Sequence, residues 1–110
     1  MSREFLGGFE LVVLLAVLRR GDDAYGVTIC EAIKASSGRD VAIARVYITL
    51  DRLERKALLQ SRLGEPTPER GGRAKTYFRP TAKGLREARR ARQTLISLWL
   101  GVRKLERGTT

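Results

Sequence analysis

Polar side chains recur at helical spacing between Ala42 and Lys56, where they would form one exposed ridge on a short helix. Positions i, i+4, i+7 and i+11 hold Arg45, Thr49, Arg52 and Lys56. Together with Ile48 beside them, these residues offer cations for phosphates, hydrogen-bonding groups for base edges and an apolar group for a thymine methyl. A helix lying in a DNA major groove would present such a set. The alternative interpretation is the solvated face of an ordinary amphipathic helix.

The other side of this segment is apolar. Five residues recur there at helical spacing: Ile43, Val46, Leu50, Leu53 and Ala57. A stripe of this length is sufficient to bury a helix against a core. We therefore expect a helix with one buried side and one side exposed to a partner or to solvent.

The composition restricts the available chemistry. The chain of 110 residues has no histidine and a single cysteine, Cys30, which excludes zinc fingers, histidine-based catalysis and disulfide frameworks. The sequence has no clustered carboxylates and no phosphate-binding glycine loop, so we predict no enzyme, no cofactor and no bound metal. An excess of 22 Lys and Arg over 12 Asp and Glu gives a net charge of +10, which favours a polyanionic partner.

The positive charge is concentrated after position 40, whereas the preceding part is nearly neutral. This asymmetry is typical of a nucleic-acid binder. The longest apolar run, Leu11 to Leu18, is too short to span a bilayer and follows no cationic signal segment. We therefore expect a cytoplasmic protein with no membrane partner.

Two further helices should precede the ridge. The first spans about Phe9 to Leu18, is apolar on every side except at Glu10, and should end near Gly21. A second copy of the chain would cover it most easily. The next helix should be capped by Asp23, and Asp40 is the expected cap of the helix that carries the ridge.

A β-hairpin is predicted after the ridge helix. Short runs of strand-forming residues at 59–63 and 76–80 flank a segment rich in glycine and proline. The cations at its tip or just inside it are Arg70, Arg73 and Lys75. From there they could reach phosphates or a minor groove, and a solvated loop is the alternative.

A long final helix should begin after Thr81, which is placed to cap it, and should run to about Arg107. Alternating spacings of three and four residues join Leu85, Ala88, Arg92, Leu95, Trp99 and Val102. This heptad-like seam has nothing left to pack on within one small domain, so it predicts dimerisation. Cations on the outward side of this helix are expected to be solvated and to attract DNA at long range.

Three helices followed by a basic hairpin are the element order of a winged helix-turn-helix. A closer resemblance is carried by residues 14–18 (LLAVL), 23–26 (DAYG), 46–54 (VYITLDRLE), 71–78 (GGRAKTYF) and 81–84 (TAKG). In this order and spacing, the chain resembles the PadR family of bacterial transcriptional regulators over essentially its whole length. One departure is Ala57, where such proteins usually have glycine. Alanine there either costs about 1 kcal/mol in a left-handed conformation or forces a different turn.

The resemblance implies a mainly α fold with a small β-hairpin, namely a winged helix-turn-helix plus a C-terminal dimerisation helix. The corresponding domains are residues 1–80, whose N-terminal helix contributes to the dimer, and residues 81–110. The implied function is a homodimeric regulator, most simply a repressor, that binds an inverted-repeat operator in double-stranded DNA. The alternative is a PadR-like dimeric adaptor without specific DNA binding.

Individual roles follow from this interpretation. Candidates for base contact are Arg45, Ile48, Thr49 and Arg52. Lys56 and the hairpin cations Arg70, Arg73 and Lys75 are expected to hold the DNA backbone. Tyr47 either places its hydroxyl on a phosphate or packs against the preceding helix. Trp99 either fills the dimer interface or, as the resemblance implies, stacks on a small planar aromatic effector.

Overall fold

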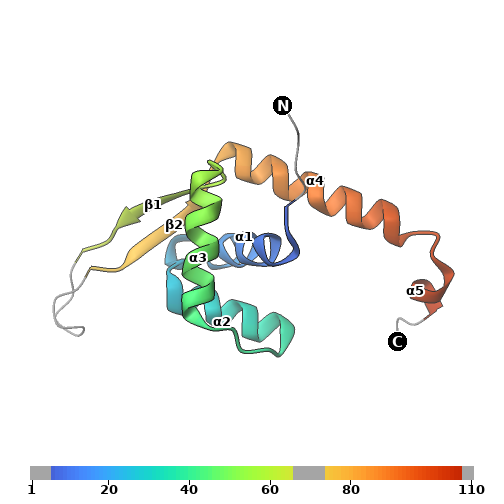
Figure 1. Ribbon diagram of the computed structural model, residues 1–110, viewed down its shortest axis with the longest axis horizontal. Coiled ribbons are helices and arrows are strands. Elements are labelled where there is room, and N and C mark those ends of the chain that lie inside the picture. The colour runs from blue at the N-terminus through green and yellow to red at the C-terminus, as the bar shows by residue number, and fades with distance from the viewer. Residues whose placement is uncertain (1–5, 66–73, 108–110) are drawn as a thin grey trace.

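The computed structural model describes residues 6–65 and 74–107 (Figure 1). In chain order, its elements are α1 (Gly8–Arg20), the 3₁₀ turn η1 (Gly21–Asp23), α2 (Gly26–Ser37), α3 (Ile43–Arg55), β1 (Leu59–Leu63), β2 (Thr76–Pro80), α4 (Ala82–Trp99) and α5 (Arg103–Arg107). This order confirms the predicted mainly α fold with a small hairpin. Among the described residues, no helix is both long and apolar enough to cross a membrane.

The core lies between α1, α2, α3 and the base of the hairpin. Its largest fully buried side chains are Leu14, Ile29, Leu50, Leu53, Leu59, Val13, Val17 and Val46. The predicted stripe of α3 is therefore buried at Val46, Leu50 and Leu53, but the prediction was wrong at its two ends. Ile43 is the first residue of α3 and is 43% exposed, and Ala57 lies in the exposed turn that follows α3.

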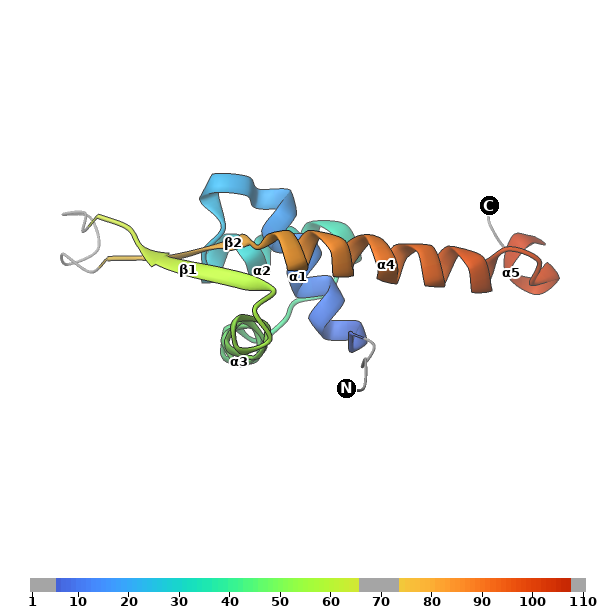
Figure 2. The ribbon, with the colours of Figure 1, turned by 90° about the horizontal axis from the view of Figure 1, so that it is seen from above.

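The hairpin pairs β1 with β2 in antiparallel register, from Leu59 opposite Pro80 to Leu63 opposite Thr76. Phe78 is buried, and its backbone N–H donates a 2.8 Å hydrogen bond to the carbonyl oxygen of Ala24. This bond ties β2 to the turn before α2, so the base of the hairpin is fixed to the core. Figures 1 and 2 show the hairpin and α4 projecting from opposite sides of the helical core.

Two of the predicted helix caps were wrong. Asp23 ends η1, too early to cap α2, and forms a 2.8 Å ion pair with Arg20. The side chain of Thr28 accepts a 3.0 Å hydrogen bond from the Tyr25 N–H at the start of α2 instead. Asp40 is paired with Lys34 at 3.2 Å, and α3 begins after Ala42 without a side-chain cap.

The final helix is shorter than predicted. The Thr81 cap is confirmed, because its hydroxyl oxygen accepts a 3.0 Å hydrogen bond from the Gly84 N–H. However, α4 ends at Trp99, and the chain turns at Gly101, whose φ of +89° suits glycine. Apolar spacing continues past this turn, which is why the sequence pattern overestimated the helix. Val102 consequently lies outside α4.

Candidate nucleic-acid interface

The exposed side of α3 carries two cations and one apolar side chain. Figure 2 looks along α3 and shows it at the edge of the molecule. Arg45, Ile48 and Arg52 are exposed there, with Ile48 at 61%. Arg52 follows Arg45 by seven positions, so their Cα atoms lie about 10 Å apart along the helix axis. This face has the size and composition to contact several consecutive base pairs.

Thr49 does not belong to this face, so its predicted role in base contact was wrong. Thr49 is only 4% exposed, and its hydroxyl donates a 2.9 Å hydrogen bond to the carbonyl oxygen of Arg45. Thr49 follows Val46 by three residues and precedes Leu53 by four, so it shares their buried side. Residues four apart on a helix do not lie directly above one another. Thr49 is therefore rotated from Arg45 toward the core.

The prediction for Lys56 also needs correction. Its ammonium lies 3.0 Å from Oε1 and 2.9 Å from Oε2 of Glu10, at the start of α1. The Glu10 side chain is only 8% exposed, and the backbone N–H of Gly7 donates a 2.9 Å hydrogen bond to Oε1. Lys56 is therefore an internal partner of α1, rather than a free cation available to phosphates.

Burial by itself raises the pKa of the Glu10 carboxyl. Hydrogen bonds from Lys56 and Gly7, with the positive charges of Lys56 and Arg52, outweigh this effect, so the pKa lies below its ordinary value. The carboxylate is therefore ionised at neutral pH, and its negative charge interacts with the positive charges of Arg52 and Lys56.

A second contact joins the same turn of α1 to α3. The guanidinium carbon of Arg45 lies 3.9 Å from the centroid of the Phe9 ring, a cation–π contact. One face of the guanidinium is covered, while the N–H groups around its edge keep their fork geometry for hydrogen bonding. Sequence reasoning assigned Phe9 and Glu10 no role at α3. The available signal was Glu10, the one charge in an apolar run.

Tyr47 packs against the preceding helix, which is the second of the two roles predicted for it. A Cβ added at Gly26 would clash with the Tyr47 hydroxyl and ring, so this tyrosine occupies the space that glycine leaves at the start of α2. The side chain is still about half exposed. A residue larger than glycine at position 26 would displace it.

Two cations at the tip end of the paired strands lie against aromatic rings. Lys75 Nζ lies 4.4 Å from the Tyr25 ring centroid, and Arg62 lies 4.8 Å from the Tyr77 ring. The two tyrosines meet edge to face with centroids 5.5 Å apart. Lys75 directly precedes the Leu63–Thr76 pair at the tip end of the strands, so it lies just inside the tip, as predicted. Arg70 and Arg73 lie outside the described residues.

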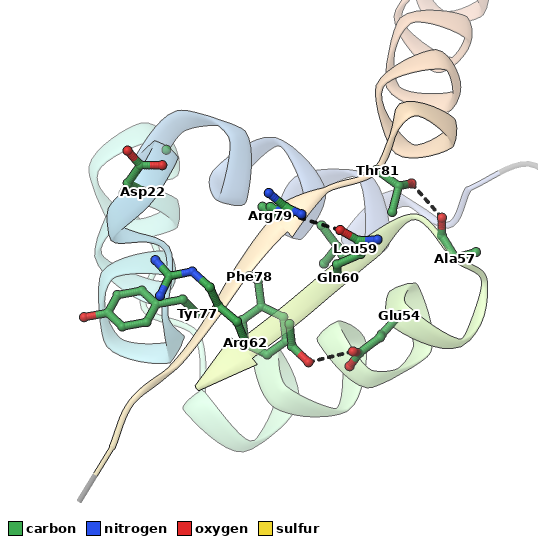
Figure 3. Close-up of a pocket in the computed structure, with 12 residues that line it drawn as sticks. Asp22, Glu54, Ala57, Leu59, Gln60, Arg62, Tyr77, Phe78, Arg79 and Thr81 are labelled. Atoms are coloured by element: carbon green, nitrogen blue, oxygen red, sulfur yellow. Dashed lines mark hydrogen bonds between the residues drawn. The ribbon is translucent and has the colours of Figure 1, made fainter. Parts of the chain in front are cut away.

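A hollow beside the hairpin is lined largely by polar groups that pair with one another (Figure 3). The Ser61 hydroxyl donates a 2.6 Å hydrogen bond to Glu54, and Arg79 donates one of 3.1 Å to Gln60. The first bond holds the hairpin to the end of α3, and the second joins the two strands of the hairpin. We therefore assign this hollow a structural role.

The predicted dimerisation seam is divided between the core and the surface. Ala88 is buried within its own chain, so its assignment to the dimer was wrong. Leu85 is half-buried, whereas Arg92, Leu95, Trp99 and Val102 are exposed. On α1, Val12 and Leu15 are also exposed, at the edge of a groove between α1 and α2.

Comparison with known proteins agrees with this arrangement. The profile of the transcriptional regulator PadR-like family matches residues 14–90. Similar crystal structures include a PadR-like regulator from Bacillus cereus, at 20% identity and a TM-score of 0.72, covering 92% of this chain and 93% of that chain. A PadR family regulator from Eggerthella lenta has 29% identity and a TM-score of 0.69, with coverage of 92% and 85%.

A PadR family regulator from Clostridium difficile has 21% identity and a TM-score of 0.67, and the alignment covers 83% of this chain and 91% of that one. A search of curated proteins found no significant match. The family profile covers the second half of α1, all of α2 and α3, the hairpin and the first half of α4. The chain therefore belongs to the PadR-like family of transcriptional regulators.

Proposed function

We propose that this transcriptional regulator is a homodimeric repressor that binds an inverted-repeat operator through α3. The observation that carries the proposal is the exposed face that Arg45, Ile48 and Arg52 form on α3. Figure 2 shows this helix at the edge of the molecule. Each arginine can pair with O6 and N7 of guanine, and Ile48 can pack on a thymine methyl. The net charge of +10 supplies the long-range attraction.

Backbone contacts come from the hairpin. Arg62 and Lys75 stand on the Tyr77 and Tyr25 rings, which limits the conformations that these long side chains can adopt. The predicted wing residues Arg70 and Arg73 are further candidates for phosphate contact. Residues 1–80 form the DNA-binding domain in this proposal.

Dimerisation uses the apolar surface that one chain leaves uncovered. The exposed residues on α4 and after it are Leu95, Ile96, Leu98, Trp99, Leu100, Val102 and Leu105. Val12 and Leu15 of α1 offer a complementary apolar groove. Packing residues 81–110 of one subunit against α1 of the other would place two α3 helices in successive major grooves, about 34 Å apart.

Trp99 has a second candidate role. It is about half exposed within the apolar surface of α4, so a planar aromatic effector could stack on it in the dimer. Because Trp99 is the single tryptophan, its fluorescence reports directly on this site. Titration with planar aromatic compounds should quench it, and unchanged fluorescence across a broad panel would leave only an interface role.

The direct test of DNA binding selects duplexes from a random pool and measures their affinity by fluorescence anisotropy as the salt concentration changes. We expect selected sequences with two-fold symmetry. If the dimer neutralises about six to ten phosphates, log K should fall against log salt with a slope of about −5 to −9. A protein that enriches no sequence, or binds equally at all salt concentrations, would instead fit the adaptor alternative.

A further inference from the structure

The first turn of α1 lies beside the outer side of α3. Phe9 contacts Arg45 of the first turn of α3, and the next residue, Glu10, binds Lys56, which follows the last turn. Gly7, Phe9, Glu10, Arg45, Ile48, Thr49, Arg52 and Lys56 line one hollow. The ion pair therefore lies within the surface that the proposed function presents to DNA.

The two partners of the ion pair are buried to different extents. The Glu10 side chain is 8% exposed, whereas that of Lys56 is 36% exposed. The Lys56 side chain could reach solvent. If it did, the Glu10 carboxylate would lose both hydrogen bonds from Lys56 and would keep only the one from the Gly7 N–H. A buried carboxylate without its counter-charge is strongly unfavourable. Glu10 thus retains Lys56.

Arg52 differs from its two neighbours. Arg45 rests on Phe9 and Lys56 is bound by Glu10, whereas the Arg52 side chain has no hydrogen bond or ion pair within residues 6–65 and 74–107. The Glu10 charge also lies close enough to Arg52 to interact with it electrostatically. One buried carboxylate therefore both binds one cation and lowers the positive potential around another.

We propose that Glu10 is a positioning residue that withholds Lys56 from DNA and thereby limits the sequence-independent part of the affinity. This inference rests on the proposed function. A lysine on a phosphate releases counterions wherever the protein binds, so it strengthens operator and random DNA alike. Holding Lys56 on Glu10 keeps that contribution small, while Arg45, Ile48 and Arg52 remain available to base edges.

The experiment compares the full-length wild type with Glu10→Gln, Lys56→Gln and the double variant. Glu31→Gln is the matched control, because it removes the same charge from an exposed position on α2 without releasing a cation. Each protein binds a selected operator and a random-sequence duplex of equal length over a range of salt concentrations. Circular dichroism verifies that each variant is folded.

For Glu10→Gln, the slope of log K against log salt should steepen on both duplexes by about 0.9 per subunit, and random-duplex affinity should rise roughly ten-fold per subunit at 0.1 M salt. The ratio of the two affinities should stay at its wild-type value. A merely structural role for Glu10 would disturb α3 and lower that ratio without steepening the slope. The double variant should return to the wild-type slope, because its position 56 carries no charge.

The double variant leaves no unpaired buried charge, so it keeps the inference testable even if Glu10→Gln does not fold. Its salt slope should equal that of the wild type, and a slope shallower by about 0.9 per subunit would mean that Lys56 contacts phosphate and that the inference is wrong. Equal slopes for Glu10→Gln and Glu31→Gln would also overturn it. If the wild type itself binds no DNA in a salt-dependent manner, the proposed function fails instead.

Discussion

The Thr81 hydroxyl donates a 2.6 Å hydrogen bond to the carbonyl oxygen of Ala57, joining the cap of α4 to the turn that ends α3. Two further contacts support this junction. Lys83 Nζ donates a 3.0 Å hydrogen bond to the carbonyl oxygen of Lys56, and the Thr81 N–H donates one of 3.1 Å to Leu58. The helix proposed for the dimer is therefore attached directly to the helix proposed for the operator.

Gly84 should tolerate no side chain at this junction. A Cβ built on it would clash with the backbone oxygen of Leu58. We expect Gly84→Ala to lower the free energy of unfolding by roughly 1–3 kcal/mol, as overpacking does elsewhere. Urea denaturation of Gly8→Ala is the control, since a Cβ at Gly8 meets nothing within 4 Å. Similar stabilities for the two variants would contradict the close contact.

Ala57 has a φ of +62°, the left-handed region that L-residues adopt at a cost. Ala57→Gly should therefore raise the free energy of unfolding by about 1 kcal/mol. Ala35→Gly, in the exposed last turn of α2, should instead lower it by up to about 1 kcal/mol. Chemical denaturation tests whether the free energies of unfolding of the two variants change in opposite directions. A loss of stability in both would contradict the left-handed conformation of Ala57.

Arg52→Ala should relax specificity at one or two base positions by roughly 1–3 kcal/mol. The measurement is affinity for the selected operator and for each of its single-base variants. Arg55→Ala provides a control on the same helix, because Arg55 is paired with Asp51 at 2.9 Å. If Arg52→Ala weakened all duplexes equally, Arg52 would be a phosphate contact.

Leu95→Glu should shift the dimer towards monomer. Leu95 is 55% exposed in the apolar surface of α4, where a carboxylate buried between subunits would be unpaired. Leu63→Glu introduces the same charge at a leucine that is 73% exposed on the hairpin and should leave the dimer unchanged. Sedimentation velocity distinguishes these outcomes, and a Leu95→Glu dimer of wild-type affinity would exclude this interface.

The Glu10–Lys56 pair should make stability depend on acid pH. The folded-state pKa of Glu10 lies below its value in the unfolded chain, which is about 4.3. Its contribution is therefore complete above pH ~4.3 and is lost as the pH falls through the folded pKa. Between pH 6 and 3, the wild type should lose more stability than Glu10→Gln, whereas Glu31→Gln should follow the wild type. Parallel curves for all three would contradict this assignment.

Local rules were sufficient for most of the fold. The period of Val46, Leu50 and Leu53 predicted the buried side of α3, because helical geometry sets which side chains share a face. Breaker residues between two strand-forming runs predicted the hairpin, and the Thr81 cap depended on a residue three positions away. The same helical period predicted that Arg45 and Arg52 would be exposed.

Tertiary structure decided which members of the polar ridge remain available. Thr49 lies with Val46 and Leu53 on the side of α3 that packs against the core, and Lys56 is bound by a carboxylate 46 residues earlier in the chain. The sequence determined α3 and its two chemically different faces, since helical period and apolar burial act locally. Only the fold decided that Glu10 meets Lys56, because a buried charge takes its partner from whichever element packs beside it.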